Sequence, residues 1–447
     1  MQTAPPQNRI MELHFGFQNI FFLVALGIAA FFFAKNFGKV WRNIRLGRPI
    51  ERNDRKGERW KLMAKVALGQ GKMVRRRAVA GFFHVIIYAG FLLINIEVAE
   101  ILIDGILGSH RVFMPLLGPV YDLAINFFEI LAVLVLIACI VFLWRRNVQV
   151  VDRFKELKGW AKKDGNNILY IEIVLMLALL LLGAAEANIE GNGVDGWVIS
   201  SQMAPIFAGM DQATLHIVER VAWWFHILGI FAFLNYLPYS KHFHIIMAFP
   251  NVWHAKLEPA GSFTNMESVK KEVELMMDPN ADPFAAPAEG ESSEPSRFGA
   301  KDVLDLHQVQ LMNAYSCTEC GRCTASCPAN QTGKKLSPRK VMMDTRDRLE
   351  EVSAIVDEKG KFEEDGRSLL DDFISREELW ACTTCNACAD ACPVNIDPMS
   401  IIVEMRRYLV MEESAANPSL NTMMTNVENN GAPWAYAQAD RANWISE

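Results

Sequence analysis

The sequence has no excess of basic residues and few charged residues of any kind. Its 45 Lys and Arg stand against 51 Asp and Glu, which gives a net charge of −6, and charged residues make up 21% of the 447 residues. These figures and a hydrophobic content of 51% exclude a disordered protein and one that binds nucleic acid. The mean hydropathy is slightly positive, which indicates a chain that lies partly in lipid.

Long apolar runs are absent after residue 240. Before that point, five segments are long enough to cross a hydrocarbon core of about 30 Å. They lie at about 16–35, 80–103, 120–144, 167–187 and 217–238. The chain therefore has a membrane half and a soluble half.

Lys and Arg are almost missing from two of the four loops between these segments. Arg111 is the single basic residue between the second and third segments, and none occurs from Asp164 to Glu219. The first loop, 35–77, has fifteen, and residues 145–163 have seven. By the positive-inside rule, the first and third loops and the soluble half are cytoplasmic and the N-terminus lies outside. No small-residue cleavage site follows the first run, which predicts a permanent helix of a multi-pass protein in the cell (inner) membrane.

Cysteine is scarce outside one region. Eight of the nine cysteines lie between Cys317 and Cys392, in two runs that both read C-x2-C-x2-C-x3-C-P, and the ninth is Cys139. Clustered cysteines in a long chain without a cleavable signal peptide indicate metal ligands rather than disulfides. Cys139, inside an apolar run, is expected to be a small packed residue.

The spacing within the two runs is typical of a pair of [4Fe-4S] clusters. The first three cysteines of such a run wrap one cluster, and the fourth ligates the other cluster. A zinc site would not explain the third cysteine or the Cys-Pro pair. The predicted ligands are Cys317, Cys320, Cys323 and Cys392 for cluster 1, and Cys382, Cys385, Cys388 and Cys327 for cluster 2.

Histidines in the apolar segments are further candidate ligands. His84 lies in the second segment, His226 lies in the fifth, and His244 closes the same element eighteen residues later, five helical turns along one face. Neutral imidazole is a good axial ligand for haem iron. Because His84 and His244 both lie toward cytoplasmic ends, we predict that they clamp one haem b. A hydrogen-bonded structural role is the alternative, above all for His226, and His242 is expected to be solvated or phosphate-facing.

Carboxylates at membrane depth are candidates for handling protons at a quinone site, since ionisable groups are costly in lipid unless they are paired or wetted. Glu97 and Glu219 approach the outer face and are the predicted quinone-site residues. For Glu219, an ion pair with Arg220 is the alternative. The carboxylates at membrane depth or at its edge are Glu97, Glu100, Glu129, Glu172, Glu186 and Glu219.

The membrane half, about 15–255, resembles the gamma-type cytochrome b subunit of respiratory nitrate reductases and the membrane subunits of heterodisulfide reductases. The resemblance rests on FFHVIIYAGF in the second segment and FHILGIFAFLNYLPYSKHFHI in the fifth. It implies two haems b, held by histidines ten residues apart on the second helix and eighteen apart on the fifth. Ile94 lies at the position where the second histidine of the second helix is expected. The sequence therefore predicts one haem, held by His84 and His244. His226 is the candidate ligand of a second haem.

The soluble half, about 300–410, resembles the iron-sulfur subunit of heterodisulfide reductases and of anaerobic glycerol-3-phosphate dehydrogenase, and more distantly that of succinate dehydrogenase. The shared features are the two cysteine runs, LSPRKV, and LWACTTCNACADACPVNIDPMSIIVEMRR. CCG repeats, a G-x-G-x-x-G fingerprint and a nucleophile with a base are missing. The resemblance implies an electron-transfer subunit whose cytoplasmic catalytic partner is of CCG-repeat or flavoprotein type.

We therefore expect an all-α fold in which a five-helix transmembrane cytochrome b bundle is fused to a helical double-[4Fe-4S] ferredoxin-type domain. Helical patterns at 337–349 and 375–382, and a spacer rich in Pro, Ala and Ser within 277–298, support this division. The expected parts are a membrane domain (1–250), an interfacial segment and flexible linker (251–298), the cluster domain (299–410) and a C-terminal extension (411–447).

The expected function is electron transfer between the quinone pool and a cytoplasmic redox partner. A membrane-anchored iron-sulfur sensor or scaffold without quinone chemistry is the alternative. A third hypothesis is a complete enzyme that acts on a soluble disulfide or hydroxyacid.

Overall fold

Helices make up almost all of the regular structure. The computed structural model describes residues 15–75, 77–155, 157, 159–189, 197–259, 261–279, 297–435 and 437–446. Within these ranges the β pairing consists of two isolated bridges, Arg48 with His307 and Leu370 with Ile374. The predicted all-α class is confirmed. Most of the predicted spacer at 277–298 lies outside the described residues.

Five long helices form the membrane half, and all five are long and apolar enough to cross a membrane. Each contains one of the five predicted segments or nearly all of it, and extends past it by several residues. Large apolar side chains such as Phe31 and Leu123 are exposed, as expected for surfaces that face lipid. The helices are α1 (Phe17–Arg45), α3 (Ala78–Leu107), α5 (Pro119–Asn147), α7 (Gly159–Ile189) and α9 (Gln212–Tyr236).

The fifth crossing does not continue as one helix to His244, so the expectation that His226 and His244 share one helix face is wrong. Two 3-10 turns, Leu237–Tyr239 and Lys241–Phe243, separate α9 from α10 (His244–Trp253). The carboxylate of Asp164 in α7 accepts hydrogen bonds from the Tyr236 hydroxyl (2.6 Å), the Ser240 hydroxyl (2.7 Å) and the Lys241 amide (3.0 Å). This buried carboxylate stabilises the turn that redirects the chain.

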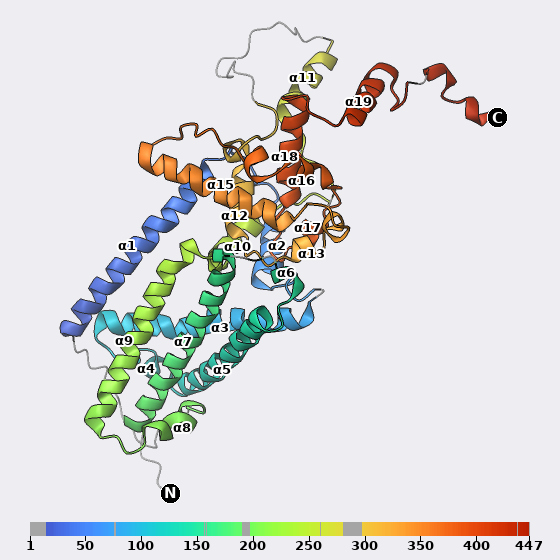
Figure 1. Ribbon diagram of the computed structural model, residues 1–447. Helices are drawn as coiled ribbons and strands as arrows, with labels where there is room; N and C mark the ends of the chain where they lie inside the picture. The colour runs from blue at the N-terminus through green and yellow to red at the C-terminus, as the bar shows by residue number, and fades with distance from the viewer. Residues whose placement is uncertain are drawn as a thin grey trace.

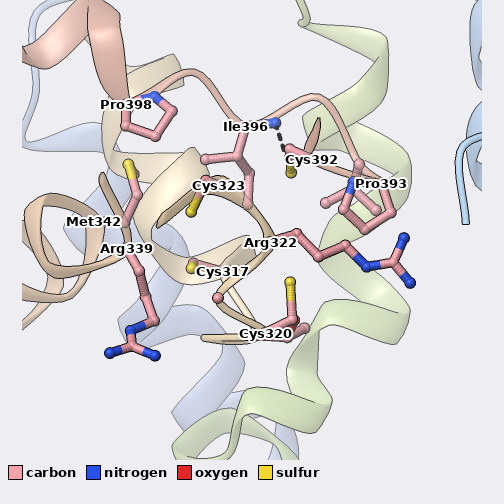
Figure 2. A pocket seen from close by; sticks show the side chains of 13 residues that line it. Cys317, Cys320, Arg322, Cys323, Arg339, Met342, Cys392, Pro393, Ile396 and Pro398 are labelled. Atoms are coloured by element: carbon pink, nitrogen blue, oxygen red, sulfur yellow. Dashed lines mark hydrogen bonds between the residues drawn. The ribbon is translucent and has the colours of Figure 1, made fainter. Parts of the chain in front are cut away.

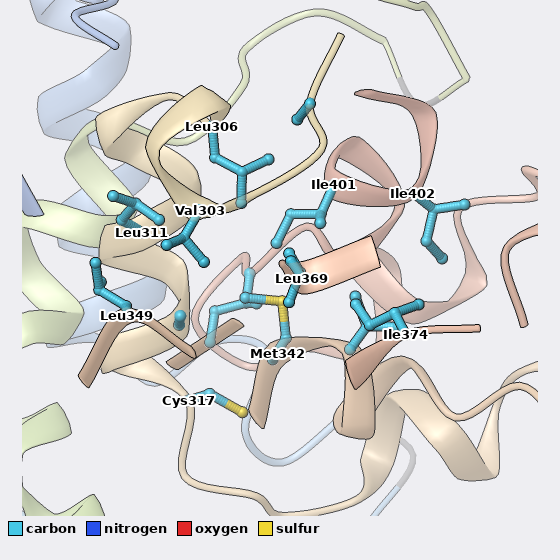
Figure 3. Close-up of a cluster of buried hydrophobic side chains, with 14 of the residues drawn as sticks. Val303, Leu306, Leu311, Cys317, Met342, Leu349, Leu369, Ile374, Ile401 and Ile402 are labelled. Carbon is cyan, nitrogen blue, oxygen red and sulfur yellow. The ribbon is translucent and has the colours of Figure 1, made fainter. Parts of the chain in front are cut away.

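The soluble half is a helical domain built around one apolar core (Figure 3). Leu306, Leu311, Leu349 and Ile401 are fully buried in it. The predicted helix at 337–349 is part of a longer helix, α15, whose apolar side chains face this core. The helices are α12 (Gln308–Ser316), α13 (Arg322–Ala325), α14 (Pro328–Gln331), α15 (Pro338–Lys359), α16 (Arg376–Ala381), α17 (Ala387–Ala391) and α18 (Pro398–Met411).

Shorter helices connect these parts or extend from them. They are α2 (Lys56–Met63), α4 (Met114–Leu117), α6 (Asp152–Lys155), α8 (Ser200–Met203), α11 (Glu267–Met277) and α19 (Pro418–Asn430), with π-helical segments at Ala64–Leu68 and Leu369–Phe373. In Figure 1, α19 projects away from the rest of the molecule.

The cluster domain is packed directly on the bundle. Helix α1 reaches α12 and α15 (Figure 1), and Ile44 and Met247 are buried in the same apolar core as the cluster domain. The Asn43 amide donates a hydrogen bond to the Tyr315 hydroxyl at 2.8 Å. Because one core spans both halves, the covalent segment at 251–298 is not the sole attachment of the domain.

A buried arginine joins three segments of the cluster domain and provides a test of its stability. Arg348 is fully buried and donates hydrogen bonds to Asp302, Asp365 and the carbonyl oxygen of Arg367. We expect Arg348→Ala to lower the free energy of unfolding by about 3 kcal/mol, because it leaves partly buried carboxylates without their cation. Thermal or denaturant unfolding, followed by the visible absorbance of the domain, measures the change.

The matched control is Arg376→Ala. Arg376 pairs with Asp371 on the surface, where the two side chains are 42% and 52% exposed, so its loss should change stability by no more than about 0.5 kcal/mol. Equal effects of the two substitutions would contradict the role assigned to Arg348.

Candidate functional site

The first cysteine run is a loop between α12 and α14 that turns its thiols inward. Cys317 caps α12, and Cys323 lies in α13. Between them, Glu319 and Gly321 have positive φ angles of 55° and 71°, which bend the loop back on itself.

The second run repeats this backbone. Cys382 caps α16, and Thr384 and Asn386, two and four residues later, have φ angles of 54° and 60°. These are the positions that Glu319 and Gly321 hold in the first run. A shared sequence spacing thus produces a shared loop, although Gly is present at only one of the four positive-φ positions.

Cysteines of both runs line one cavity (Figure 2). Cys317, Cys320 and Cys323 come from the first run, and Cys392 comes from the end of the second. In the same way, Cys327 of the first run interacts electrostatically with Cys382 and Cys388 of the second. The fourth cysteine of each run thus lies beside cysteines of the other run.

These thiols suit a polynuclear cluster. Four cysteines from two runs are a suitable ligand set for a [4Fe-4S] cluster, in which each cysteine binds a different iron. Burial raises the pKa of Cys317 to about 12 and that of Cys392 to about 11. Burial therefore favours the neutral thiols, and a bound metal would be the group that stabilises the thiolates. The Ile396 amide donates a hydrogen bond to the Cys392 sulfur at 3.3 Å.

His84 of α3 faces His244 at the start of α10, with ring centroids 6.3 Å apart. A metal about 2 Å from one nitrogen of each ring would separate the ring centres by about 6 Å. The Nδ1–H of His244 donates to the carbonyl oxygen of Lys241 at 3.0 Å, which leaves Nε2 free to bind a metal. Nδ1 of His84 is buried without a hydrogen-bond partner among the described residues. The geometry of the two rings is compatible with the predicted axial ligation of a haem b by His84 and His244.

His226 lies apart from this pair. It is 2% exposed, and its Nδ1 donates to the carbonyl oxygen of Leu175 at 3.1 Å. Ile94, at the position where a second ligand is expected, is itself buried. Among the described residues, histidine rings meet only within the group His84, His242 and His244.

The expectation that His242 is solvated is wrong. It is 8% exposed, and its ring centroid lies 5.1 Å from that of Phe233 and 5.7 Å from that of His244. Its Nε2 lies 3.9 Å from a carboxylate oxygen of Glu172. The turn at Asp164 folds this segment back into the bundle, and no spacing pattern in the sequence indicated it.

Arg322 connects the histidine pair with the first cysteine cavity. It is 7% exposed and lines that cavity (Figure 2). Its positive charge interacts with Cys320 and Cys392 on one side and with His84 on the other. The first cysteine run thus lies next to the end of α3 that carries His84.

The carboxylates at the opposite end of the bundle are engaged in polar networks. Glu219 is 4% exposed and accepts a hydrogen bond from Arg220 Nε at 2.6 Å. Glu97 interacts electrostatically with Arg111, which is ion-paired with Glu186. Thirteen residues of α3 separate Glu97 from His84, about 20 Å along the helix axis.

Comparisons with known proteins support the iron-sulfur part of this arrangement. Residues 316–396 match the family model of the 4Fe-4S dicluster domain. The probable iron-sulfur-binding oxidoreductase FadF of Bacillus subtilis (strain 168) is 30% identical, over 96% of this chain and 61% of the relative. EtfAB:quinone oxidoreductase of Syntrophomonas wolfei is 28% identical, over 89% of this chain and 55% of the relative. The chain thus spans less than two thirds of either relative.

A shorter match covers the soluble half. One subunit of the ferredoxin/F(420)H(2)-dependent CoB-CoM heterodisulfide reductase of Methanosarcina acetivorans is 31% identical, over 25% of this chain and 56% of the relative. The predicted resemblance to heterodisulfide reductase is confirmed, and the matches support an electron-transfer role for this chain. No solved structure matches it.

Proposed function

We propose that this chain carries electrons between the membrane quinone pool and a cytoplasmic redox partner, using one haem b and two [4Fe-4S] clusters. The single observation that carries the proposal is the place of Arg322, whose charge acts both on His84 and on the cysteines of the first cavity. When bound, the haem and the clusters would supply one-electron redox chemistry.

The residues of the chain have distinct roles in this proposal. His84 and His244 hold the haem, and the two interlocked cysteine sets hold clusters 1 and 2. Cys385 is exposed, so cluster 2 is the proposed contact with the soluble partner, and cluster 1 lies between it and the haem.

The proposed topology follows the four parts expected from sequence, with the N-terminus outside and the cluster domain in the cytoplasm. Residues of both basic loops contact that domain. Lys72 donates a hydrogen bond to the Asn395 side chain at 2.8 Å, and Arg339 donates to the carbonyl oxygen of Arg153 at 2.7 Å. These contacts support a common side for the first loop, the third loop and the clusters.

The names of two relatives suggest what lies at each end of the electron route. The name EtfAB:quinone oxidoreductase pairs EtfAB with a quinone, and the heterodisulfide reductase relative is named as a subunit of a reductase. We propose a flavoprotein or a CCG-repeat subunit as the cytoplasmic partner of this chain. Glu97 and Glu219 are the proposed proton-handling residues of the quinone site.

The proposal predicts direct exchange with quinol. A reduced menaquinone or ubiquinone analogue added to the purified full chain should reduce haem b, or a quinone should oxidise it if the natural direction is the reverse. Cluster reduction by quinol should lag or fail in His84→Ala, because the haem between quinone and clusters loses a ligand. Rapid mixing with visible spectroscopy follows both groups.

A soluble low-potential donor is the control, since it should reduce the clusters equally in wild type and in His84→Ala. Glu97→Gln and Glu219→Gln test the quinone site, and unchanged quinol kinetics in both would place the quinone elsewhere. If quinol leaves the haem spectrum unchanged while the soluble donor works, the membrane half is an anchor and the sensor or scaffold hypothesis is preferred.

A further inference from the structure

Three arginines from separate segments lie close together beside the first cysteine run, and one of them, Arg322, also interacts with His84. Arg77 precedes the first residue of α3, Arg153 lies in α6, and Arg322 lies in the first cysteine run. The charge of Arg153 interacts with Arg77 and Arg322 as well as with Cys320. We call these three residues the arginine cluster.

Within the described part of the chain, Arg153 forms no ion pair with an acidic side chain. Its Nε and Nη1 are buried there without a hydrogen-bond partner, and the strongest charge interactions of this side chain are with other arginines and a thiol. Burial and the neighbouring arginines lower the pKa of Arg153 to about 10, so it is still a cation at neutral pH. Arg153 as a whole is partly exposed, but two buried donors of a cation without a partner favour a bound anion.

Arg322 also has no carboxylate among its hydrogen-bond acceptors in the described part of the chain. Its guanidinium donates hydrogen bonds to the carbonyl oxygen and the sulfur of Met73, both at 2.9 Å, and both acceptors are neutral. Its charge acts on Cys320 and on His84. The thiolates of cluster 1 can neutralise the face toward Cys320, whereas the face toward His84 still requires negative charge.

A hollow beside the arginine cluster is lined by four basic side chains and one acidic side chain. Arg77 and Arg322 line it together with Lys72, Arg75, Ser326, Asp390 and Ala391. Lys72 and Arg75 already contact the cluster domain, Lys72 through Asn395 and Arg75 through Asp390. Of the two remaining cations, Arg322 also interacts electrostatically with His84.

We infer that Arg77, Arg153 and Arg322 bind the two propionate carboxylates of the haem that His84 and His244 hold. The inference rests on the haem of the proposed function and adds the residues that orient it. Guanidinium groups bind carboxylates through paired, parallel hydrogen bonds, so the arginine cluster fixes the rotation of the haem about its axial bonds. The propionate edge of the haem then faces Cys320 and cluster 1.

The test compares haem with its dimethyl ester, in which both carboxylates are masked. The full chain, produced in haem-deficient cells, is titrated with each form, and binding is followed by the visible spectrum. Wild type should prefer haem over the ester by about tenfold or more, since charge-assisted hydrogen bonds are lost with the ester. Arg153→Gln and Arg322→Gln should lower that preference toward one, and Arg153→Lys should restore part of it.

The matched control is Arg42→Gln. Arg42 lies at the same junction of the two halves but pairs with Asp357 and Ser353, so the preference should persist. An unchanged preference in Arg153→Gln and Arg322→Gln overturns the inference while leaving the haem in place. If these variants instead lose iron from cluster 1 and keep the preference, the arginine cluster serves cluster 1 alone and the inference is wrong. Failure of wild type to bind either form overturns the haem of the proposed function itself.

Discussion

Cys320→Ser and Cys385→Ser are each expected to remove one [4Fe-4S] cluster and retain the other. Wild type should contain about eight non-haem irons and about eight acid-labile sulfides, and each variant about four of each. Cys320 lines the first cavity, and Cys385 lies in the second run beside Cys382. Serine preserves the size of the side chain but supplies a much poorer ligand for iron. Iron and sulfide analysis with electron paramagnetic resonance measures the loss.

Cys139→Ser is the control, because Cys139 is fully buried in α5 of the bundle and should leave both clusters intact. Two zinc ions and no sulfide in wild type would contradict the cluster assignment. The exchange of the fourth cysteine also has a separate test. Cys392→Ser should damage the cluster that Cys320→Ser removes, and Cys327→Ser the cluster that Cys385→Ser removes.

The parts of this architecture that depend on local patterns could be predicted from the sequence. Each crossing is marked by a run of apolar residues, and the ends move outward by a few residues because basic side chains such as Lys35 and Arg42 continue α1 beyond the lipid. The cysteine spacing predicted an exchange of ligands between the two runs, and the cavity lined by Cys317 and Cys392 agrees with it.

The features that depend on distant residues could not be predicted in this way. The turn after α9 depends on Asp164, which precedes Ser240 by 76 residues, and periodicity alone favoured a helix that continues past Pro238. The same turn buries His242, whose neighbour Lys241 had indicated a surface position. The docking of the cluster domain likewise depends on apolar residues such as Met247, which the sequence pattern assigned only to the membrane domain.

His84→Ala and His244→Ala are expected to abolish binding of haem b, whereas His226→Ala should retain it. A low-spin haem needs both axial ligands, and the two rings that lie opposite each other are those of His84 and His244. His226 has a carbonyl partner at Leu175 and lies near no second histidine among the described residues. The pyridine haemochrome assay, expressed as haem per chain, and the low-spin electron paramagnetic resonance signal measure the outcome.

The position of His242 makes this experiment more informative. Its ring lies 5.7 Å from that of His244, so His244→Ala leaves another imidazole nearby, and a residual haem in that variant alone would identify His242 as a substitute ligand. Combining His242→Ala with His244→Ala should then remove the remaining haem. Two haems per chain in wild type, one of them lost in His226→Ala, would contradict the single-haem assignment. Such a result would also shorten the route from Glu219, since His226 lies seven residues, about 10 Å, along α9 from it.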